Sequence, residues 1–383
     1  MIYFDNSATT KMFPAALETF VKVNEAIFGN PSSLNRLGTV ANDLLQQSRK
    51  QIAENLHVKS EEIFFTSGGT EGDNWVIKGT AMAKASFGKH IITSRVEHPA
   101  VTRSMKQLEK IGFEVTYLPV NKKGVISPEE LEKEIRDDTI LVSLIAVNNE
   151  VGAIQPIAEV GDILKAYPTI HYHVDAVQAI TVFDSLMLHP RIDFFVLSAH
   201  KFNGPKGVGI LYKKEGRQIE SLLTGGGQES GQRSTTENVS GVAATAKALR
   251  MSVEANKEGT TKITALRDDV TKYLEQFSDV EIYSSADGAP HIVCFALQDV
   301  RGEVMVHALE EHDIIISTTS ACASKKGDLP ATLTSMNVPA EWARCAVRLS
   351  FSAENTQAEV ETFKRVFSQL HKKFQIIQNK RGN

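Results

Sequence analysis

The chain has 383 residues, 42% of them hydrophobic, which is enough for two or three folding units with large cores. Its formal net charge of −4, with both signs interspersed, argues against nucleic acid or an anionic membrane as the main partner. No apolar run approaches the ~20 residues that span a bilayer, and no export signal is seen in the sequence. The three cysteines are scattered and form no CxxC pair, which argues against a disulfide framework or a zinc site. We therefore expect a soluble, reduced, cytoplasmic protein.

Strands and helices alternate along the first two thirds of the chain, which is typical of a mostly parallel sheet with helices on both faces. An apolar helix pattern covers about 40–56, and a strand then leads into the turn Ser67-Gly-Gly-Thr. A capping box, with Ser127 as N-cap and Glu130 at N3, opens a further helix. Apolar runs predict the remaining strands at 90–93, 113–118, 139–147, 170–174, 194–197 and 208–212.

The order of elements changes after about residue 256. Gly259-Thr-Thr predicts a hinge between two helical runs, and Thr356 with Glu359 forms a capping box before a C-terminal helix. Short strands and helices fill the space between them. We therefore predict a large α/β domain over 14–256 and a smaller α+β domain made of 1–13 plus 257–383.

Polar side chains gather just after the predicted strands. In an open α/β sheet the ligand lies outside the carboxyl ends of the strands. A single strand-end lysine such as Lys201 more often reaches solvent, and any one of these residues is more often a turn or cap residue. Seven of them at one sheet edge favour a ligand site instead: His98, Asn149, Asp175, Gln178, Ser198, His200 and Lys201.

The chemistry of these residues fits pyridoxal 5'-phosphate. The cofactor aldehyde needs an amine, which a desolvated Lys201 supplies, and its pyridine nitrogen needs an anion, which Asp175 supplies. His98 is suited to stack on the ring. Glycines before a helix start create an anion site for the phosphate, and the candidate phosphate donors are Gly69, Thr70, Ser198 and His200.

The motifs Asp-Asn-Ser-Ala-Thr-Thr, Gly-Asn-Pro-Ser-Ser, Thr-Ser-Gly-Gly-Thr-Glu, Glu-His-Pro-Ala, Val-Asn-Asn-Glu, His-Val-Asp-Ala-Val-Gln, Ser-Ala-His-Lys and Ser-Ala-Cys-Ala-Ser occur in this order between Tyr3 and about Thr356. Together they resemble the cysteine desulfurases of the class V aminotransferase superfamily. The resemblance implies fold type I of the pyridoxal-phosphate-dependent transferases. The Ser-Ala-Cys motif resembles the group of desulfurases whose cysteine sits on a long mobile loop.

The resemblance implies a role at each matching position of the cofactor site. Lys201 corresponds to the Schiff-base lysine and His98 to a ring-stacking histidine that also serves in acid–base catalysis. Gln178 would bond the phenolic oxygen of the cofactor, and Asp175 its pyridine nitrogen. Thr70, Ser198 and His200 would hold the phosphate together with Thr236 of a neighbouring subunit, which implies a homodimer.

It also implies a conversion of L-cysteine to L-alanine. Arg348 would bind the substrate carboxylate, Asn149 would contact the cofactor–substrate adduct, and the Cys322 thiolate would accept the sulfur as a persulfide. An acceptor protein would then take the sulfur, for iron–sulfur clusters, tRNA thiolation or thiamine synthesis. We expect Cys294 and Cys345, within or beside apolar strands, to be small buried hydrophobes.

Some positions depart from the family pattern. The family usually has His at Asn35, Arg at Ser230, Gly at Thr235 and Gly-Arg in place of Ser352-Ala353. These differences leave the active-site rim and the acceptor surface open. A selenocysteine lyase or another class V enzyme is the alternative function, although an aminotransferase has no use for a nucleophilic thiol. A non-enzymatic sulfur carrier or scaffold is a weaker alternative, because Lys201 is retained.

Overall fold

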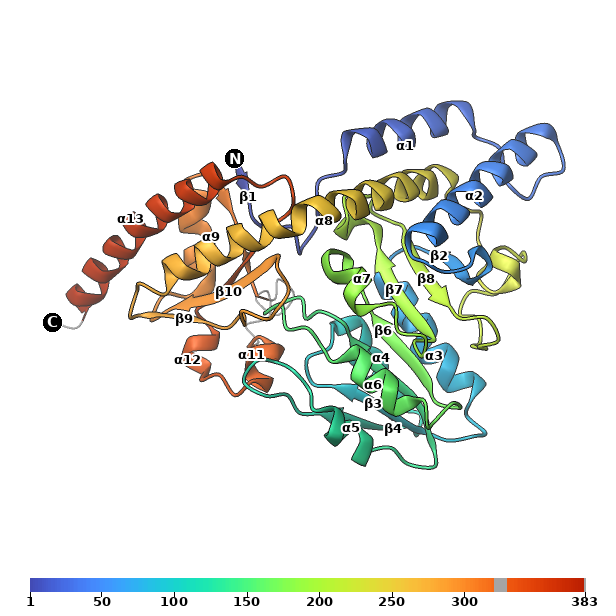
Figure 1. Cartoon of the computed structure of the whole chain (residues 1–383), viewed down its shortest axis with the longest axis horizontal. Helices are drawn as coiled ribbons and strands as arrows, with labels where there is room; N and C mark the ends of the chain where they lie inside the picture. The colour runs from blue at the N-terminus through green and yellow to red at the C-terminus, as the bar shows by residue number, and fades with distance from the viewer. Residues whose placement is uncertain (320–328, 382–383) are drawn as a thin grey trace.

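The computed structural model describes residues 1–319 and 329–381, with only the backbone described at 257–259 and 377–381. Two separate sheets dominate the molecule, and the long helix α8 (Val239–Leu274) runs alongside both of them (Figure 1). The larger sheet lies under α8 and carries the predicted strand-end residues. The smaller sheet, drawn in orange, lies at the C-terminal end of α8 and beneath α13 (Gln357–Arg381).

The central sheet has seven strands in the order β2-β8-β7-β6-β5-β3-β4. All neighbours are parallel except β8, which runs antiparallel to both β2 and β7. The predicted α/β class with a mostly parallel sheet is confirmed. The strands of the central sheet are β2 (Ile63–Thr66), β3 (His90–Ser94), β4 (Glu114–Leu118), β5 (Thr139–Ile145), β6 (His171–Asp175), β7 (Phe194–Ser198) and β8 (Gly209–Lys213).

Helices cover this sheet, and side chains cap the start of several of them. The Ser127 hydroxyl accepts from the Glu130 amide at 3.1 Å, which confirms Ser127 as the N-cap of α5, and Asn35 caps α2 by accepting from Gly38. The remaining helices are α1 (Pro14–Ala26), α2 (Arg36–Asn55), α3 (Gly69–Ala83), α4 (Pro99–Glu109), α5 (Pro128–Lys133), α6 (Ile157–Leu164) and α7 (Phe183–Leu186), with 3-10 turns at Ser60–Glu62, Ile180–Val182, Ala199–Lys201 and Glu229–Gly231.

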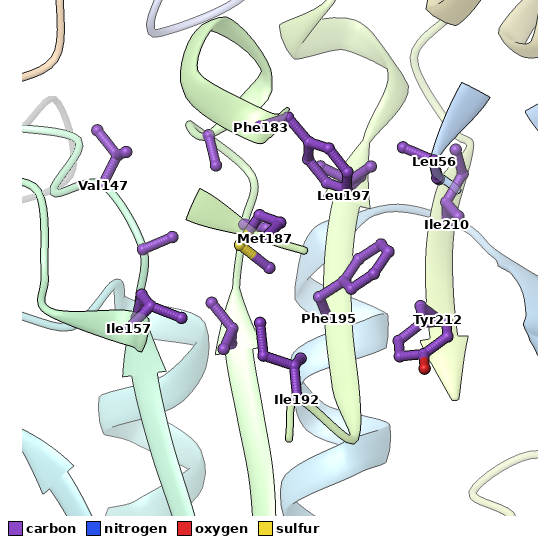
Figure 2. Close-up of a cluster of buried hydrophobic side chains, with 14 of the residues drawn as sticks. Leu56, Val147, Ile157, Phe183, Met187, Ile192, Phe195, Leu197, Ile210 and Tyr212 are labelled. Atoms are coloured by element: carbon purple, nitrogen blue, oxygen red, sulfur yellow. The ribbon is translucent and has the colours of Figure 1, made fainter. Parts of the chain in front are cut away.

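A hydrophobic core fixes the register of the central strands. Phe195, Leu197, Ile210 and Tyr212 project from β7 and β8 into the cluster shown in Figure 2, and the rings of Phe195 and Tyr212 stack with their centroids 4.6 Å apart. All five residues of β7 are buried. Because apolar side chains fill both faces of these strands, their polar residues are confined to the strand ends.

The smaller sheet is antiparallel with the order β12-β13-β10-β9, and the N-terminal strand β1 pairs separately with β11. Thr356 and Glu359 form the predicted capping box of α13. Cys294 is fully buried on β10, as expected. The further elements are β1 (Ile2–Tyr3), β9 (Val280–Ile282), β10 (Ile292–Leu297), β11 (Ile314–Ile315), β12 (Ser317–Thr318), β13 (Ala346–Ser350), α9 (Gly302–Glu310), α11 (Ala331–Ser335) and α12 (Ala340–Ala343).

The predicted hinge at residues 259–261 is wrong. Helix α8 continues through this stretch without interruption, from Val239 to Leu274. A glycine within a helix costs only about 1 kcal/mol relative to alanine, and α8 is held by buried residues on both sides, with Leu249 in the core of the large sheet and Ile263 and Leu266 in that of the small one. No helix in the described part of the chain has the length and apolar content needed to cross a bilayer.

Candidate active site

A cavity of about 270 Å³ opens at the carboxyl ends of the central strands. Nine of the ten residues predicted to hold the cofactor line this cavity. The side chains predicted at the strand ends therefore surround a single cavity. The lining residues are Ser7, Gly69, Thr70, Asp73, His98, Ile145, Asn149, Asp175, Val177, Gln178, Ser198, His200 and Lys201.

Lys201 ends the 3-10 turn that follows β7, and its amine is desolvated. Its Nζ donates to the carbonyl oxygens of Ser7 at 2.6 Å and Ala8 at 2.8 Å. Burial, reinforced by the positive charge of Arg348, lowers the pKa of Lys201 to about 8, although Asp5 and Asp175 oppose the shift. An amine with this pKa is partly neutral near pH 7 and is therefore a competent nucleophile toward a carbonyl.

Asp175 and His98 lie close to each other in the cavity wall. Asp175, the last residue of β6, is 2% exposed and accepts from the Val177 amide at 3.0 Å. Burial raises the pKa of Asp175, and the nearby charges of His98 and Lys201 oppose this rise. The Nδ1 atom of His98 accepts from the Ala100 amide at 3.1 Å, and burial lowers the pKa of His98. A neutral His98 thus carries its proton on Nε2.

The start of α3 is the predicted anion cradle. A Cβ atom on Gly69 would lie 2.7 Å from Cγ2 of Val177 and 3.6 Å from Cβ of Ser198, so only glycine fits there without a shift. His200 lies beside the cradle with its Nδ1 atom 3.1 Å from the hydroxyl oxygen of Thr9. Burial and the charge of Lys201 lower the pKa of His200 to about 4, so at neutral pH it acts through hydrogen bonds rather than charge.

The N-terminal segment contributes residues that the strand-end argument missed. The Ser7 carbonyl accepts from both Lys201 and the Gln178 side chain, at 3.0 Å from its Nε2 atom. The hydroxyl of Ser7 lacks a hydrogen-bond partner among the described residues, although it is buried. The Asp-Asn-Ser-Ala-Thr-Thr motif was the available signal, but no predicted strand placed it near the sheet edge.

Arg348 links the smaller sheet to the cavity. From β13, its Nη1 atom donates to the Asn149 carbonyl at 2.6 Å, and its Nη2 atom donates to Asp5 Oδ1 at 3.0 Å. The side chain is 5% exposed, and its Nε–H finds no partner within the described chain. Part of this guanidinium is therefore free to bind a further acceptor. Asp5, which orients it, was not predicted.

Asp73 is a further cavity residue that the sequence did not reveal. It lies one turn into α3, is 1% exposed, and its Oδ1 has no hydrogen-bond partner in the described part of the chain. Burial, with the charges of Asp175 and Glu97, raises its pKa well above the ordinary range. Single ligand atoms of Asp73, His98 and Asp175 lie within 4.8 Å of one another. Because these atoms border the cavity, the cluster belongs to the same site.

Cys322 lies outside the described residues. Thr236 is exposed and does not line the cavity of its own chain. Among the departures from the family pattern, Asn35 caps α2, and Ser230 adopts a left-handed φ of +57°.

The cavity has the features that pyridoxal 5'-phosphate requires. It offers a desolvated amine, a buried carboxylate, a glycine cradle at a helix start, and the unpartnered hydroxyl of Ser7. Lys201 and Asp175 come from adjacent strand ends, which fixes their separation through the register of β6 and β7. These residues fit the cofactor.

The comparisons with known proteins identify the family of the chain. Residues 2–363 match the family model of the class V aminotransferases. The chain is 52% identical over 381 residues to a NifS/IcsS protein homolog of Lactobacillus delbrueckii subsp. bulgaricus, covering 98% of this chain and 99% of that one. It is 40% identical over 375 residues to the cysteine desulfurase IscS of Clostridium botulinum, covering 97% and 94%.

A solved structure of a NifS-like protein superposes with a TM-score of 0.91 at 36% identity, covering 98% of this chain and 99% of that one. The chain belongs to the class V aminotransferase family and, within it, to the cysteine desulfurases, enzymes that depend on pyridoxal 5'-phosphate.

Proposed function

We propose that this enzyme converts L-cysteine to L-alanine and holds the released sulfur as a persulfide on Cys322, from which an acceptor protein takes it. The observation that carries the proposal is the convergence of Lys201, Asp175 and His98 on one cavity with Arg348 at its edge. The cofactor binds there through the residues that the sequence motifs identify. The name of the Clostridium relative supports the reaction class.

Each cofactor contact has a defined task. Bound pyridoxal 5'-phosphate supplies an aldehyde that condenses with amines and a ring that withdraws electrons. Lys201 anchors it through the amine, Asp175 holds a proton at the pyridine nitrogen, and His98 stacks on the ring. Gln178 bonds the phenolic oxygen. The phosphate is held by Gly69, Thr70, Ser198, His200 and, from a second copy of the chain, Thr236.

Substrate recognition falls to the edge of the cavity. Arg348 binds the carboxylate of L-cysteine with the N–H groups that Asn149 and Asp5 leave free, because a planar guanidinium forms two parallel bonds with a carboxylate. Asn149 contacts the bound substrate from the end of β5. With the cofactor bound, the Lys201 amine would be the base that moves a proton at the substrate Cα.

Sulfur transfer needs a thiolate. The Cys322 thiolate forms a bond with the substrate sulfur while the carbon–sulfur bond breaks. The electron pair of the broken bond stays with the substrate Cβ, which takes up a proton to give L-alanine, and the sulfur remains on Cys322 as a persulfide. The two other thiols are poor candidates because burial raises the pKa of both, strongly for Cys294. Their buried, unpaired state supports a cytoplasmic location, where thiols stay reduced.

A second copy of the chain is part of the proposal. Thr236 is exposed and does not line the cavity of its own chain, which is consistent with a role in a neighbouring site. The first two helices and the loop between them expose large apolar side chains, a pattern that favours burial against another protein surface. These side chains are Leu17, Val21, Phe28, Leu34, Leu37 and Val40.

The two-domain division stays a proposal as well. We assign residues 14–256 to a cofactor-binding domain and 1–13 with 257–383 to a smaller one that carries the Cys322 segment. Support comes from two distinct hydrophobic cores, one around the central sheet and one in which Phe4 packs with Phe363 and Phe367. The continuous α8 connects the two cores.

The decisive experiment measures alanine and sulfide from L-cysteine, with L-selenocysteine and L-alanine as alternative substrates and candidate acceptors present. Cys322→Ser is expected to keep the yellow cofactor colour and to form neither persulfide nor alanine. Cys345→Ser is the matched control and should retain activity. Full activity of Cys322→Ser would refute the persulfide role. Exclusive turnover of L-selenocysteine would instead identify a selenocysteine lyase.

A further inference from the structure

The segment 224–238, which carries Thr236, is irregular but firmly anchored in its own chain. Arg49 donates to both carboxylate oxygens of Glu229, at 2.9 and 2.7 Å, and this pair is nearly inaccessible to solvent. Glu229 and Ser230 hold left-handed φ angles of +50° and +57°, which non-glycine residues seldom adopt. A segment that keeps such angles is held in place by its surroundings.

A second ion pair joins this segment to the phosphate cradle. The Nε and Nη2 atoms of Arg233 donate to the two oxygens of Glu71 at 2.7 and 2.9 Å, a two-pronged contact. The two side chains are 14% and 16% exposed. Glu71 also accepts from the Ser67 amide at 2.7 Å, so the carboxylate spans the turn that leads into α3. Arg233 precedes Thr236 by only three residues.

Glu71 places a negative charge at the start of a helix that is predicted to bind an anion. It lies in the first turn of α3, next to Thr70 and two residues after Gly69. A helix start attracts one negative charge, and a carboxylate there repels a phosphate that binds at the same end. Burial opposes the charge of Glu71, but hydrogen bonds from Arg233 and Ser67 outweigh burial and keep its pKa below the ordinary value. The carboxylate is therefore charged, and Arg233 is the cation that compensates it.

We propose that Arg233 is a positioning residue for the cofactor phosphate, because its ion pair with Glu71 neutralises the carboxylate beside the phosphate cradle and holds the Thr236 segment against α3. This rests on the proposed cofactor contacts of Thr70 and Thr236. One contact thereby links the phosphate site of a subunit to the segment that completes the site of its partner. Arg233 itself does not touch the phosphate.

The test measures how tightly the cofactor-free protein binds pyridoxal 5'-phosphate and, separately, inorganic phosphate as a competitor. Arg233→Gln is expected to weaken both affinities by roughly 10–100-fold, the typical effect of losing a charged hydrogen bond next to an anion. The control is Arg136→Gln, which removes an exposed pair with Glu114 far from the cradle. It should bind both ligands like the unmodified protein.

A double substitution separates charge compensation from a merely structural role. Glu71→Gln alone should bind at least as tightly as the unmodified protein, since the oxygen of the introduced amide can still accept from the Ser67 N–H. Combining E71Q with R233Q should restore most of the affinity that R233Q loses. If R233Q binds normally, or if E71Q fails to rescue it, the inference is overturned.

Two further arms close the test. Arg233→Lys keeps the positive charge without the two-pronged contact, so it should lose less affinity for pyridoxal 5'-phosphate and for inorganic phosphate than R233Q does. An equal loss in the two variants would overturn the electrostatic argument, and this comparison applies even if R233Q folds poorly. A wild-type protein that binds no cofactor would refute the proposed cofactor site itself. Failure of the inference and failure of the proposed function therefore give different results.

Discussion

The lowered pKa of Lys201 predicts how fast the cofactor-free enzyme captures its cofactor at different pH values. Only the neutral amine attacks a carbonyl. With a pKa of about 8, roughly a tenth of the Lys201 amines are neutral at pH 7, against about one in 3,000 for an ordinary lysine at 10.5. Capture at pH 7 should therefore be roughly 300-fold faster than an unperturbed lysine would allow.

The assay mixes cofactor-free protein with excess pyridoxal 5'-phosphate and follows the rise of visible absorbance from pH 6 to 10. The rate constant should rise about tenfold per pH unit and level off near pH 8. A free lysine derivative under the same conditions corrects for the titration of the cofactor, and Lys201→Ala should give no such absorbance. A rate that keeps rising through pH 10 would refute the desolvation argument.

The same shift has a consequence for folding. Between pH 8 and 10.5 the unfolded chain keeps the Lys201 proton that the folded chain releases, so the stability of the cofactor-free protein rises with pH over this window. Lys201→Met removes this contribution. The difference in free energy of unfolding between the two proteins should therefore move by up to about 3 kcal/mol in favour of the lysine form across that window.

Three further predictions concern other parts of the site and its supports. Arg348→Lys keeps the positive charge but loses the planar guanidinium, so the KM for L-cysteine should rise at least about tenfold in steady-state alanine assays, with a smaller change in kcat. An unchanged KM would contradict binding of the substrate carboxylate by Arg348. Asp175→Asn should leave cofactor bound but lower kcat by about 100-fold or more, because the ring loses its anionic partner, and a cofactor-replete variant of normal kcat would disprove that role. Arg49→Ala leaves Glu229 buried without its partner, so urea unfolding should show a loss of about 3–5 kcal/mol, whereas the exposed Lys50→Ala should lose little.

The sequence predicted the cavity through a simple constraint. Strands buried on both faces place the polar residues that reach solvent or a ligand at their ends, and parallel strands end at a common edge. His98, Asp175, Ser198 and Lys201 therefore had to meet there, and the structure brings them together. Another local pattern gave a wrong prediction, the hinge at residues 259–261. There, packing along α8 outweighed the tendency of a glycine to interrupt a helix.

Other features depend on segments that no local pattern connects. Ser7 reaches the cavity, and Asp5 reaches Arg348, because β1 pairs with β11 and the segment after it crosses to Lys201. Arg348 lies on β13, a strand of the smaller sheet. Asp73 lines the cavity because of how α3 is oriented against the central sheet.

The sequence by itself thus determined the order of elements, the sheet edge and the residues that a carbonyl cofactor needs, because hydrophobic periodicity and strand ends are local properties. Only the tertiary structure decided the pKa of Lys201, the orientation of Arg348 and the pairing of Glu71 with Arg233. These depend on burial and on distances between residues far apart in the chain, and packing alone sets both.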